Sequence, residues 1–184
     1  HVPARNGAGP ADEASALFET RWLRRDLPAT EQRGSTKPGK WLIFSDHLGI
    51  GEALAQALRQ PGGTPVVVRP AAAYQRLEGG ACTLDPEQAA EYSQLLRAEF
   101  APGERCLGVI HLWSLDATAT DRASLRSLDA DQQTGSLSVL ALAQALLQTG
   151  WPELPPLWLV TQGTQAVVEQ DRISGLSQAP LWGL

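Results

Sequence analysis

The sequence predicts an α/β fold, in which a mostly parallel sheet is covered by helices on both faces. Short apolar runs of strand length alternate along the chain with longer segments of helical periodicity. The runs are continuously apolar, as strands are when both faces of their sheet are buried. Apolar strands that alternate with helices form parallel sheets, because each connection must cross over one face.

The first strand and the first helix follow each other closely. Residues 41–44 (WLIF) form a short, fully apolar strand, and residues 50–60 form a helix that the Pro-Gly-Gly sequence of residues 61–63 ends. A strand followed at once by a helix begins a βαβ unit. The apolar face of this helix is expected to consist of Ile50, Leu54, Ala57 and Leu58.

The alternation continues to the end of the chain. Residues 65–69 (PVVVR) form a second buried strand. The next helix begins at Asp85, whose side chain caps it, has Pro86 in its first turn and ends near Phe100. The remaining predicted elements are a strand over residues 106–113 (CLGVIHLW), a long helix over residues 131–148 and a strand over residues 157–160.

The N-terminal region differs from the rest in composition. The chain has no methionine and begins with a stretch rich in Ala, Gly and Pro, so it is expected to be cut from a longer polypeptide. Residues 1–16 are predicted to be a linker or a cloning remnant, and residues 17–184 one domain. Within this domain, residues 18–23 (FETRWL) alternate like a strand, and residues 24–40 form a flexible excursion.

The composition is that of a globular protein and disfavours several classes of function. A formal net charge of −5 disfavours nucleic acid and anionic membrane as partners, and no apolar run approaches the roughly 20 residues that span a bilayer. Cys82 and Cys106 lack CxxC spacing and are predicted to be buried thiols in a reducing compartment, the cytoplasm. His111 lies inside an apolar strand and has no second His or Cys at ligand spacing, so it is predicted to be a core or strand-end histidine, and no metal site is predicted.

The turn after the first strand, SDHLGIG over residues 45–51, is the main candidate for a ligand site. The three glycines of a nucleotide-binding Rossmann turn let backbone amides approach a pyrophosphate. Gly49 and Gly51 supply only two, and Asp46 places a negative charge where phosphates would lie. Arg69 follows about 20 residues later, where an NADP-binding arginine is expected. Gly49, Gly51 and Arg69 are thus vestigial cofactor-binding candidates, although turn, packing and strand-end roles are the favoured interpretation.

No catalytic group is predicted. Ser45, Asp46 and His47 are residue types of a hydrolase triad, but adjacent residues cannot form one, and no GxSxG turn is present. Loop solvation and helix capping explain the acidic residues before the long helix better than acid-base chemistry does. These residues are Asp116, Asp121, Asp129 and Asp131.

Three sequence blocks carry a family resemblance. Residues 109–116 (VIHLWSLD), 159–167 (LVTQGTQAV) and 175–184 (GLSQAPLWGL) resemble, in this order, the structural half of a modular polyketide synthase ketoreductase. HLWSLD and QAPLWGL are not general Rossmann features, and the resemblance covers nearly everything from residue 17 onward. It implies a truncated Rossmann-like fold that does not bind NADPH and that braces the catalytic half. It also implies that the FETRWL strand pairs with that half.

The resemblance further implies that this chain lacks reductase chemistry. The family's catalytic half uses a GGTGxLG-type turn and a Ser-Tyr-Lys set, whose tyrosine donates a proton to the reduced ketone. Thr161 takes the serine position here, and no tyrosine or lysine follows it, since those present are Tyr74, Tyr92, Lys37 and Lys40. The chain alone is therefore predicted not to be an enzyme but to be part of one, with NADPH bound by the partner half. Relatives usually continue past the equivalent of Leu184, so the subdomain is expected to be incomplete at its C-terminus.

The main hypothesis is a noncatalytic structural subdomain of a type I modular polyketide synthase. It is either the structural half of an active reductase or a pseudo-ketoreductase, and its partners are the catalytic ketoreductase subdomain and adjacent synthase domains of the same polypeptide. The alternative is an NAD(P)H-binding oxidoreductase domain of the short-chain dehydrogenase type, which uses Gly49, Gly51 and Arg69. A stand-alone interaction module is a third possibility. Cofactor affinity separates the first two hypotheses.

Overall fold

The computed structural model describes residues 22–26, 39–60 and 62–184. The chain divides into two units, residues 1–32 and 33–184. Only residues 22–26 are described in the first unit, and they contain neither helix nor strand. The predicted strand over residues 18–23 is therefore wrong for its last two residues, and its other residues lie outside the described part of the chain. The second unit holds all the helices and strands that follow.

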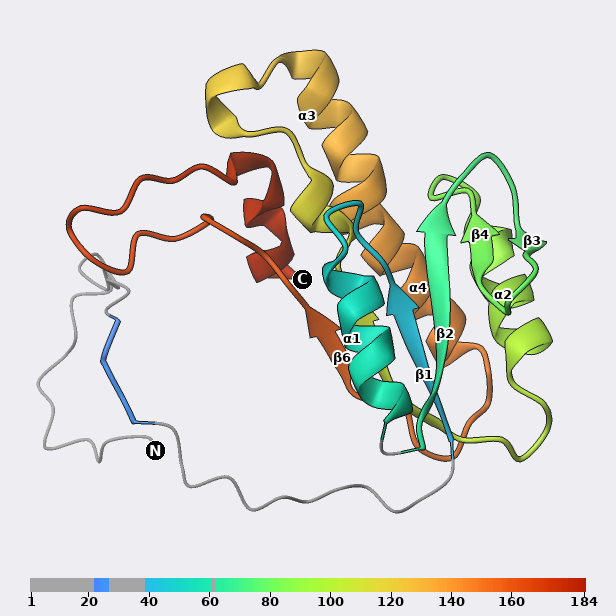
Figure 1. Ribbon diagram of the computed structural model, residues 1–184. Coiled ribbons are helices and arrows are strands. Elements are labelled where there is room, and N and C mark those ends of the chain that lie inside the picture. The colour runs from blue at the N-terminus through green and yellow to red at the C-terminus, as the bar shows by residue number, and fades with distance from the viewer. Residues whose placement is uncertain (1–21, 27–38, 61) are drawn as a thin grey trace, which may run out of the picture. The chain divides into compact units, whose positions relative to one another are not determined.

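The second unit is built on a six-stranded, mostly parallel sheet with the order β3-β4-β2-β1-β5-β6 (Figure 1). Only β3 runs antiparallel, against β4. The chain leaves β1 for β2 on one side and later crosses back to β5 on the other side, so the direction of winding changes at β1. The strands are β1 (Lys40–Phe44), β2 (Thr64–Pro70), β3 (Gln75–Arg76), β4 (Cys82–Leu84), β5 (Cys106–His111) and β6 (Leu157–Leu159).

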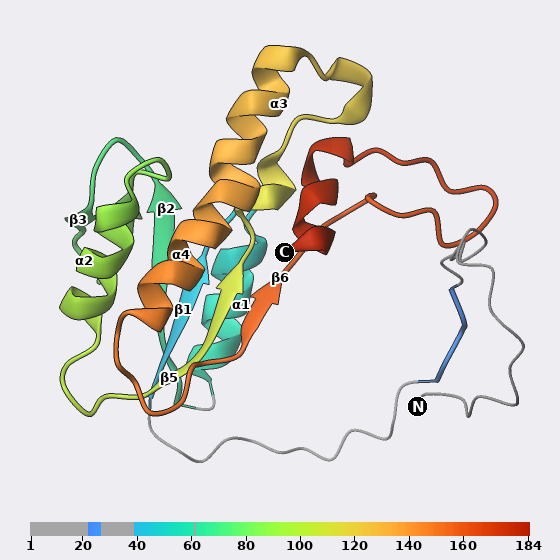
Figure 2. The ribbon, with the colours of Figure 1, turned by 180° about the vertical axis from the view of Figure 1, so that it is seen from behind.

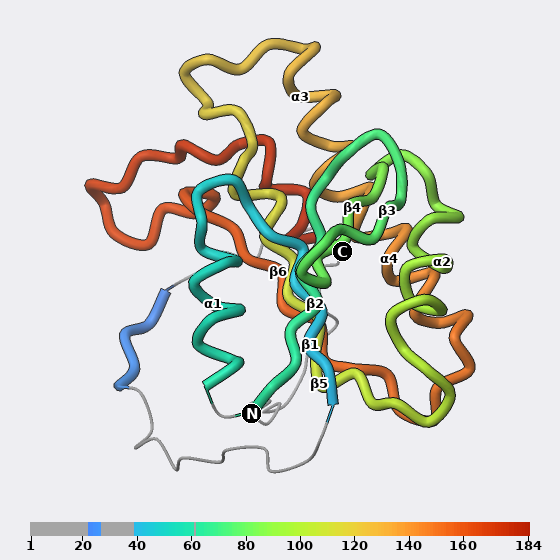
Figure 3. Tube along the Cα trace, turned by 45° about the vertical axis from the view of Figure 1, so that its right-hand side comes forward, coloured from blue at the N-terminus to red at the C-terminus, as the bar shows by residue number. Residues whose placement is uncertain are grey.

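Helices cover both faces of this sheet. Helix α1 (Ile50–Arg59) lies on one face, in front in Figure 1. Helices α2 (Ala89–Glu99) and α4 (Ser138–Leu147) pack against each other on the opposite face, in front in Figure 2. Figure 3 shows the sheet between these two layers. The predicted fold class, a mostly parallel Rossmann-like sheet with helices on both faces, is confirmed.

The two faces of the sheet form two separate cores, because successive strand side chains point to opposite faces. On the α1 side the buried side chains are those of Ile43, Ala55, Val67, Ile110 and Leu112. The larger core on the other side contains four aromatic rings, and it includes Phe44, Tyr92, Phe100, Trp113, Val68, Leu95 and Leu142. Every strand in the middle of the sheet is thus buried on both faces, which is why its sequence is continuously apolar.

The connection from β5 to α4 is longer and more irregular than the sequence predicts. The 3-10 helices η2 (Trp113–Asp116) and η3 (Thr120–Arg122) follow β5. Helix α3 (Leu125–Gln132) begins at Ser124, whose hydroxyl accepts the amide of Ser127 at 3.1 Å. A π-helical turn, η4 (Gln133–Leu137), then joins α3 to α4. The predicted helix over 131–148 therefore begins earlier and contains a π-turn.

Two other predictions need correction. Ile50 and Ala57 on α1 are exposed, and the side that meets the sheet is centred on Gly51 and Ala55, with Leu54 and Leu58 beside them. Helix α2 begins at Ala89 rather than at Asp85, because residues 85–88 form a separate turn in which the Asp85 carboxylate accepts the amide of Glu87 at 2.9 Å.

After β6 the chain has no regular structure until the 3-10 helix η5 (Leu176–Gly183). The Ser174 and Gly175 amides both donate to the carbonyl of Gly163, which closes this excursion on itself. None of the helices in residues 39–60 and 62–184 has the length and hydropathy of a membrane span. Cys82 and Cys106 are free and buried, as predicted.

Candidate functional site

The carboxyl ends of β1 and β5 form the place where a sheet of this topology usually binds a ligand. These neighbouring strands lie at the point where the direction of winding reverses, and open α/β sheets bind ligands in the crevice beyond such a point. Two segments border it, the turn over residues 45–49 after β1 and the helix η2 after β5. The turn over residues 45–51, which the sequence singles out as the main candidate, therefore lies beside this crevice.

The two glycines of the turn serve the local fold. Gly49 has a φ of +90°, a conformation that side chains other than glycine seldom adopt, and it sits at the N-cap of α1. A Cβ at Gly51 would collide with the Ser45 side chain and backbone, so Gly51 is what lets the first turn of α1 approach the end of β1. Both glycines are required whether or not a ligand binds.

The Asp46 carboxylate occupies the amino end of α1. Its Oδ1 accepts the amide of Gly51 at 2.7 Å, and its Oδ2 accepts the amide of Ile50 at 3.2 Å. The Asp46 residue is only 6 % exposed. In a Rossmann unit, the free amides at this helix end are the donors for a pyrophosphate. Here two of them already hold a carboxylate of the same chain.

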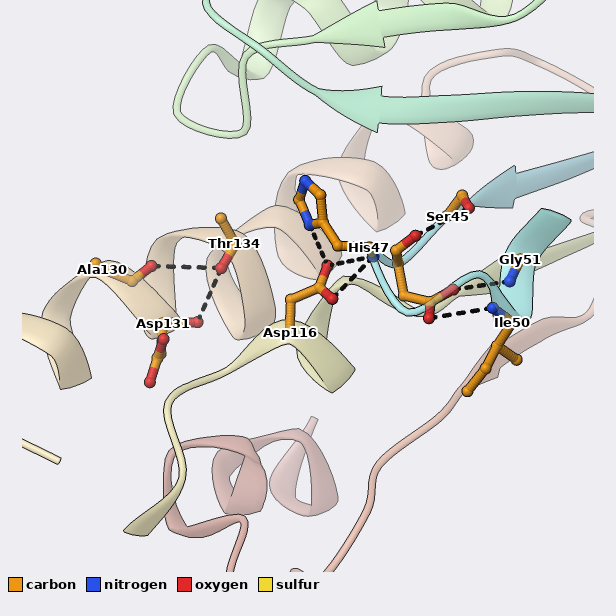
Figure 4. A network of polar contacts seen from close by, with 9 residues as sticks. Ser45, His47, Ile50, Gly51, Asp116, Ala130, Asp131 and Thr134 are labelled. Carbon is orange, nitrogen blue, oxygen red and sulfur yellow. Dashed lines mark hydrogen bonds and ion pairs between the residues drawn. The ribbon is translucent and has the colours of Figure 1, made fainter. Parts of the chain in front are cut away.

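A second carboxylate holds the turn from the other side of the crevice. Asp116, at the end of η2, accepts the His47 amide through both oxygens, at 2.9 and 3.1 Å, and its Oδ2 lies 2.8 Å from Nδ1 of the His47 ring (Figure 4). These contacts connect the turn after β1 with the segment after β5. The ends of both central strands are thus bridged by Asp116 and lined by negative charge. A dinucleotide phosphate placed here would meet two carboxylates.

Arg69 is also engaged by its own chain. It lies near the end of β2, and its guanidinium forms an ion pair with Glu52 from the first turn of α1. Both side chains are about half exposed, so the pair contributes little stability. It does orient the guanidinium toward α1. The three predicted vestigial residues therefore lie around one helix end, where carboxylates engage the local donors.

The residues that an active reductase would need are not brought together. Lys40 lies at the start of β1, whereas Thr161 follows the end of β6. Because both strands run parallel to β5, the two residues lie at opposite ends of the strands. Tyr92 is buried on α2 and donates to the carbonyl of Pro86 at 3.1 Å. Burial and the neighbouring Cys82 and Glu99 raise the pKa of Tyr74 to about 12. Lys37 lies outside the described residues.

Neither cysteine has the surroundings of a nucleophile. Burial, together with the nearby Glu99 carboxylate, raises the pKa of Cys82 to about 12. Burial raises the pKa of Cys106 to about 11. Reactive cysteines have lowered pKa values and some exposure, because the thiolate is the reactive form. Both thiols therefore serve as packing groups. Among the described residues, no cluster of His, Cys, Asp and Glu is arranged to hold a metal ion.

His111 and Ser138 form a buried polar pair that no sequence motif predicts. His111, at the end of β5, is fully buried between the rings of Phe44 and Trp113. Its Nε2 lies 3.0 Å from the Ser138 hydroxyl, which also contacts the carbonyls of Thr134 at 2.6 Å and Gly135 at 2.8 Å. Burial lowers the pKa of the His111 ring to about 3. The sequence predicted a core or strand-end histidine, and the structure confirms it.

The chain is similar to a known family over more than half of its length. Residues 39–155 match the model described as "Beta-ketoacyl synthase-like, N-terminal". A search of curated proteins finds no match. The matched range includes the candidate crevice and ends just before β6.

Several solved structures share the fold. One is a multidomain structure of an adenylation domain, a ketoreductase and a pseudo Asub from a keto acid-selecting NRPS module, with a TM-score of 0.74 and 24 % identity over 86 % of this chain and 13 % of that one. A second is an N-terminal ketoreductase from a macrolactin assembly line, with a TM-score of 0.56 and 15 % identity over 74 % of this chain and 28 % of that one. A Serratia marcescens short-chain dehydrogenase/reductase gives a TM-score of 0.53 and 18 % identity over 79 % of this chain and 68 % of that one.

These structures establish the fold of the second unit and its likeness to ketoreductase regions. The chain spans less than a third of the length of the NRPS-module structure and of the macrolactin ketoreductase structure that it matches. The resemblance that the sequence predicted, to a ketoreductase-related region of a modular synthase, is confirmed.

Proposed function

The chain belongs to the family of beta-ketoacyl synthase-like N-terminal domains, and from this premise we propose that it is a noncatalytic structural subdomain of a type I modular polyketide synthase. It braces the catalytic ketoreductase half or a neighbouring processing domain of the same polypeptide. NADPH is bound by that partner and not by this chain. Residues 17–184 form this subdomain, and it works in the cytoplasm.

One observation carries the noncatalytic part of the proposal. The helix end that would hold a pyrophosphate is capped by Asp46, and Asp116 holds the adjoining His47 amide. A phosphate can displace a carboxylate from these amides only if the buried carboxylate finds another partner, because an unpaired buried charge costs several kcal/mol. Among the described residues, neither the two tyrosines nor Lys40 accompanies Thr161, so this part of the chain offers the crevice no proton donor for ketone reduction.

Cofactor titration tests this directly. The purified chain is titrated with NADPH up to millimolar concentration, following cofactor fluorescence and energy transfer from tryptophan. We expect no saturable signal from the wild type. Arg69→Ala is the informative variant, since it removes the one cation placed for a 2′-phosphate. Saturable binding that this variant loses would overturn the proposal in favour of the short-chain dehydrogenase alternative.

A co-expression experiment tests the bracing role. The catalytic ketoreductase half of the same synthase is produced alone and together with this chain, and soluble, NADPH-dependent reduction of a model β-keto thioester is measured. We expect the activity of the catalytic half to depend on this chain. Equal yield and activity without it would contradict a bracing role and leave a pseudo-ketoreductase or a separate interaction module.

A further inference from the structure

A cavity lies at the end of the sheet opposite to the candidate crevice, near the residues where β1 and β2 begin. Figure 1 shows these strand starts at the bottom. The volume of the cavity is about 360 Å³. The charged side chains that line it come from four different elements: Lys40 at the start of β1, Arg59 at the end of α1, Arg76 in β3 and Glu99 at the end of α2. It is therefore a site that the tertiary fold assembles.

The cavity is locally cationic in an acidic protein. Three cations and one carboxylate line it, whereas the whole chain has a formal net charge of −5. Lys40 is already held, since its ammonium donates to Glu104 Oε2 at 2.8 Å and to the Glu99 carbonyl at 2.6 Å. The other two cations keep unused donors. Arg59 makes no ion pair within the described part of the chain, and Arg76 approaches only Glu99, at 3.6 Å.

The Glu99 carboxylate is buried, and its side-chain contacts are all made through one of its two oxygens. Its side chain is 2 % exposed, yet its contacts with Tyr74 Oη and Cys82 Sγ are both 3.4 Å and its contact with Arg76 Nε is 3.6 Å. Hydrogen bonds from hydroxyls to carboxylates are usually 2.5–2.7 Å long. All three contacts are to Oε1, and Oε2 has no hydrogen bond among the described residues. One acceptor oxygen at the wall of the cavity thus remains open.

We propose that this cavity binds a small phosphate monoester that also carries a hydroxyl or ammonium group. The guanidinium groups of Arg59 and Arg76 suit a phosphate, because each can donate two parallel hydrogen bonds. The open oxygen of Glu99 then accepts the hydrogen of the second group. A ligand with both groups can reach each side of the cavity, whereas inorganic phosphate offers Glu99 only a hydroxyl on the phosphorus atom itself. No residue of the candidate crevice takes part, so this inference is independent of the proposed function.

Calorimetric and NMR titrations at low ionic strength test the proposal, with glycerol 3-phosphate as probe and inorganic phosphate for comparison. We expect saturable binding of glycerol 3-phosphate at millimolar or lower concentration, and weaker binding of inorganic phosphate. The double variant Arg59→Ala/Arg76→Ala, which changes exposed side chains only, is expected to weaken binding at least about tenfold, since two charge-assisted contacts are lost. Arg97→Ala, on the exposed side of α2, is the matched control and is expected to bind like the wild type.

Glu99→Gln separates the two halves of the site. It is expected to weaken the binding of glycerol 3-phosphate but not that of inorganic phosphate, which no longer meets a carboxylate, and thermal unfolding shows whether the variant is folded. If it is not, the arginine double variant alone decides. The proposal would be overturned if glycerol 3-phosphate, at millimolar concentration and in 20-fold excess over the protein, gave no saturable binding. Binding that the arginine double variant retains would also overturn it. Binding to vesicles containing phosphatidic acid without binding of the soluble ester would overturn the small-molecule assignment.

Discussion

Acid should destabilise this protein through one buried imidazole, that of His111. The ring is fully buried against Phe44 and Trp113, and its Nε2 lies 3.0 Å from the Ser138 hydroxyl. Burial lowers its pKa from 6.5 to about 3. Because the folded state disfavours the imidazolium, the unfolded chain takes up a proton first as the pH falls. The contribution of the neutral His111 ring to the free energy of unfolding is fully present above pH 6.5 and is lost progressively between pH 6.5 and 3.

The size of the loss follows from the two pKa values. At pH 5 the unfolded histidine is almost fully protonated and the folded one almost fully neutral, so the free energy of unfolding falls by about 2 kcal/mol relative to pH 7. Below pH 3 the total would approach about 5 kcal/mol. Other groups titrate over the same range, and a comparison with a variant removes their contribution.

The assay is urea unfolding of the wild type and of His111→Asn at pH 7 and at pH 5, with tryptophan fluorescence as the signal. We expect the variant to be less stable at pH 7, because it leaves a cavity, but to lose about 2 kcal/mol less than the wild type on acidification. Gly183→Ala leaves every imidazole in place and adds a Cβ that meets open space, so it is expected to keep the wild-type loss. Equal losses in the wild type and in His111→Asn would refute the assignment of this pH dependence to His111.

Two further predictions concern the turn after β1. Asp46→Ala removes the acceptor of two α1 amides and is expected to lower the free energy of unfolding by about 2 kcal/mol, whereas Asp46→Asn, which keeps an acceptor oxygen, should lose about half of that in the same urea measurement. Gly51→Ala is expected to cost about 2 kcal/mol or more in thermal or urea unfolding, because the new methyl group overlaps Ser45, while Gly183→Ala, where a Cβ meets open space, should leave stability within about 0.5 kcal/mol.

The sequence predicts the sheet well because its central strands are buried on both faces. Residues 41–44, 65–69, 106–113 and 157–160 all contain strands of the parallel sheet, and their continuous apolar character is a direct consequence of that burial. Strands β3 and β4 escape prediction because they are only two and three residues long and lie at the edge. Helix α3 escapes because none of its residues is buried, so it has no apolar face to give it a period.

The candidate site could be located from sequence, but its geometry could not. The position of the turn and the unfavourable charge of Asp46 follow from the order of residues after an apolar strand. The contact between Asp116 and the His47 amide joins residues 69 positions apart, and it depends on β5 lying beside β1. The same limit applies to Glu99, which in sequence is an ordinary acidic residue in the last turn of a helix and in the structure is almost fully buried.

The turn after β1 separates two requirements that a functional Rossmann turn combines. Glycine at positions 49 and 51 meets a steric requirement, a left-handed backbone and the close approach of α1 to Ser45, and this requirement persists without any ligand. Phosphate binding adds a second requirement, free amides at the helix end. Asp46 engages two of those donors and at the same time supplies the negative charge that the helix end attracts. A Rossmann-like turn can therefore keep both its glycines and its stability with a carboxylate of its own chain, rather than a phosphate, on the amides of the helix end.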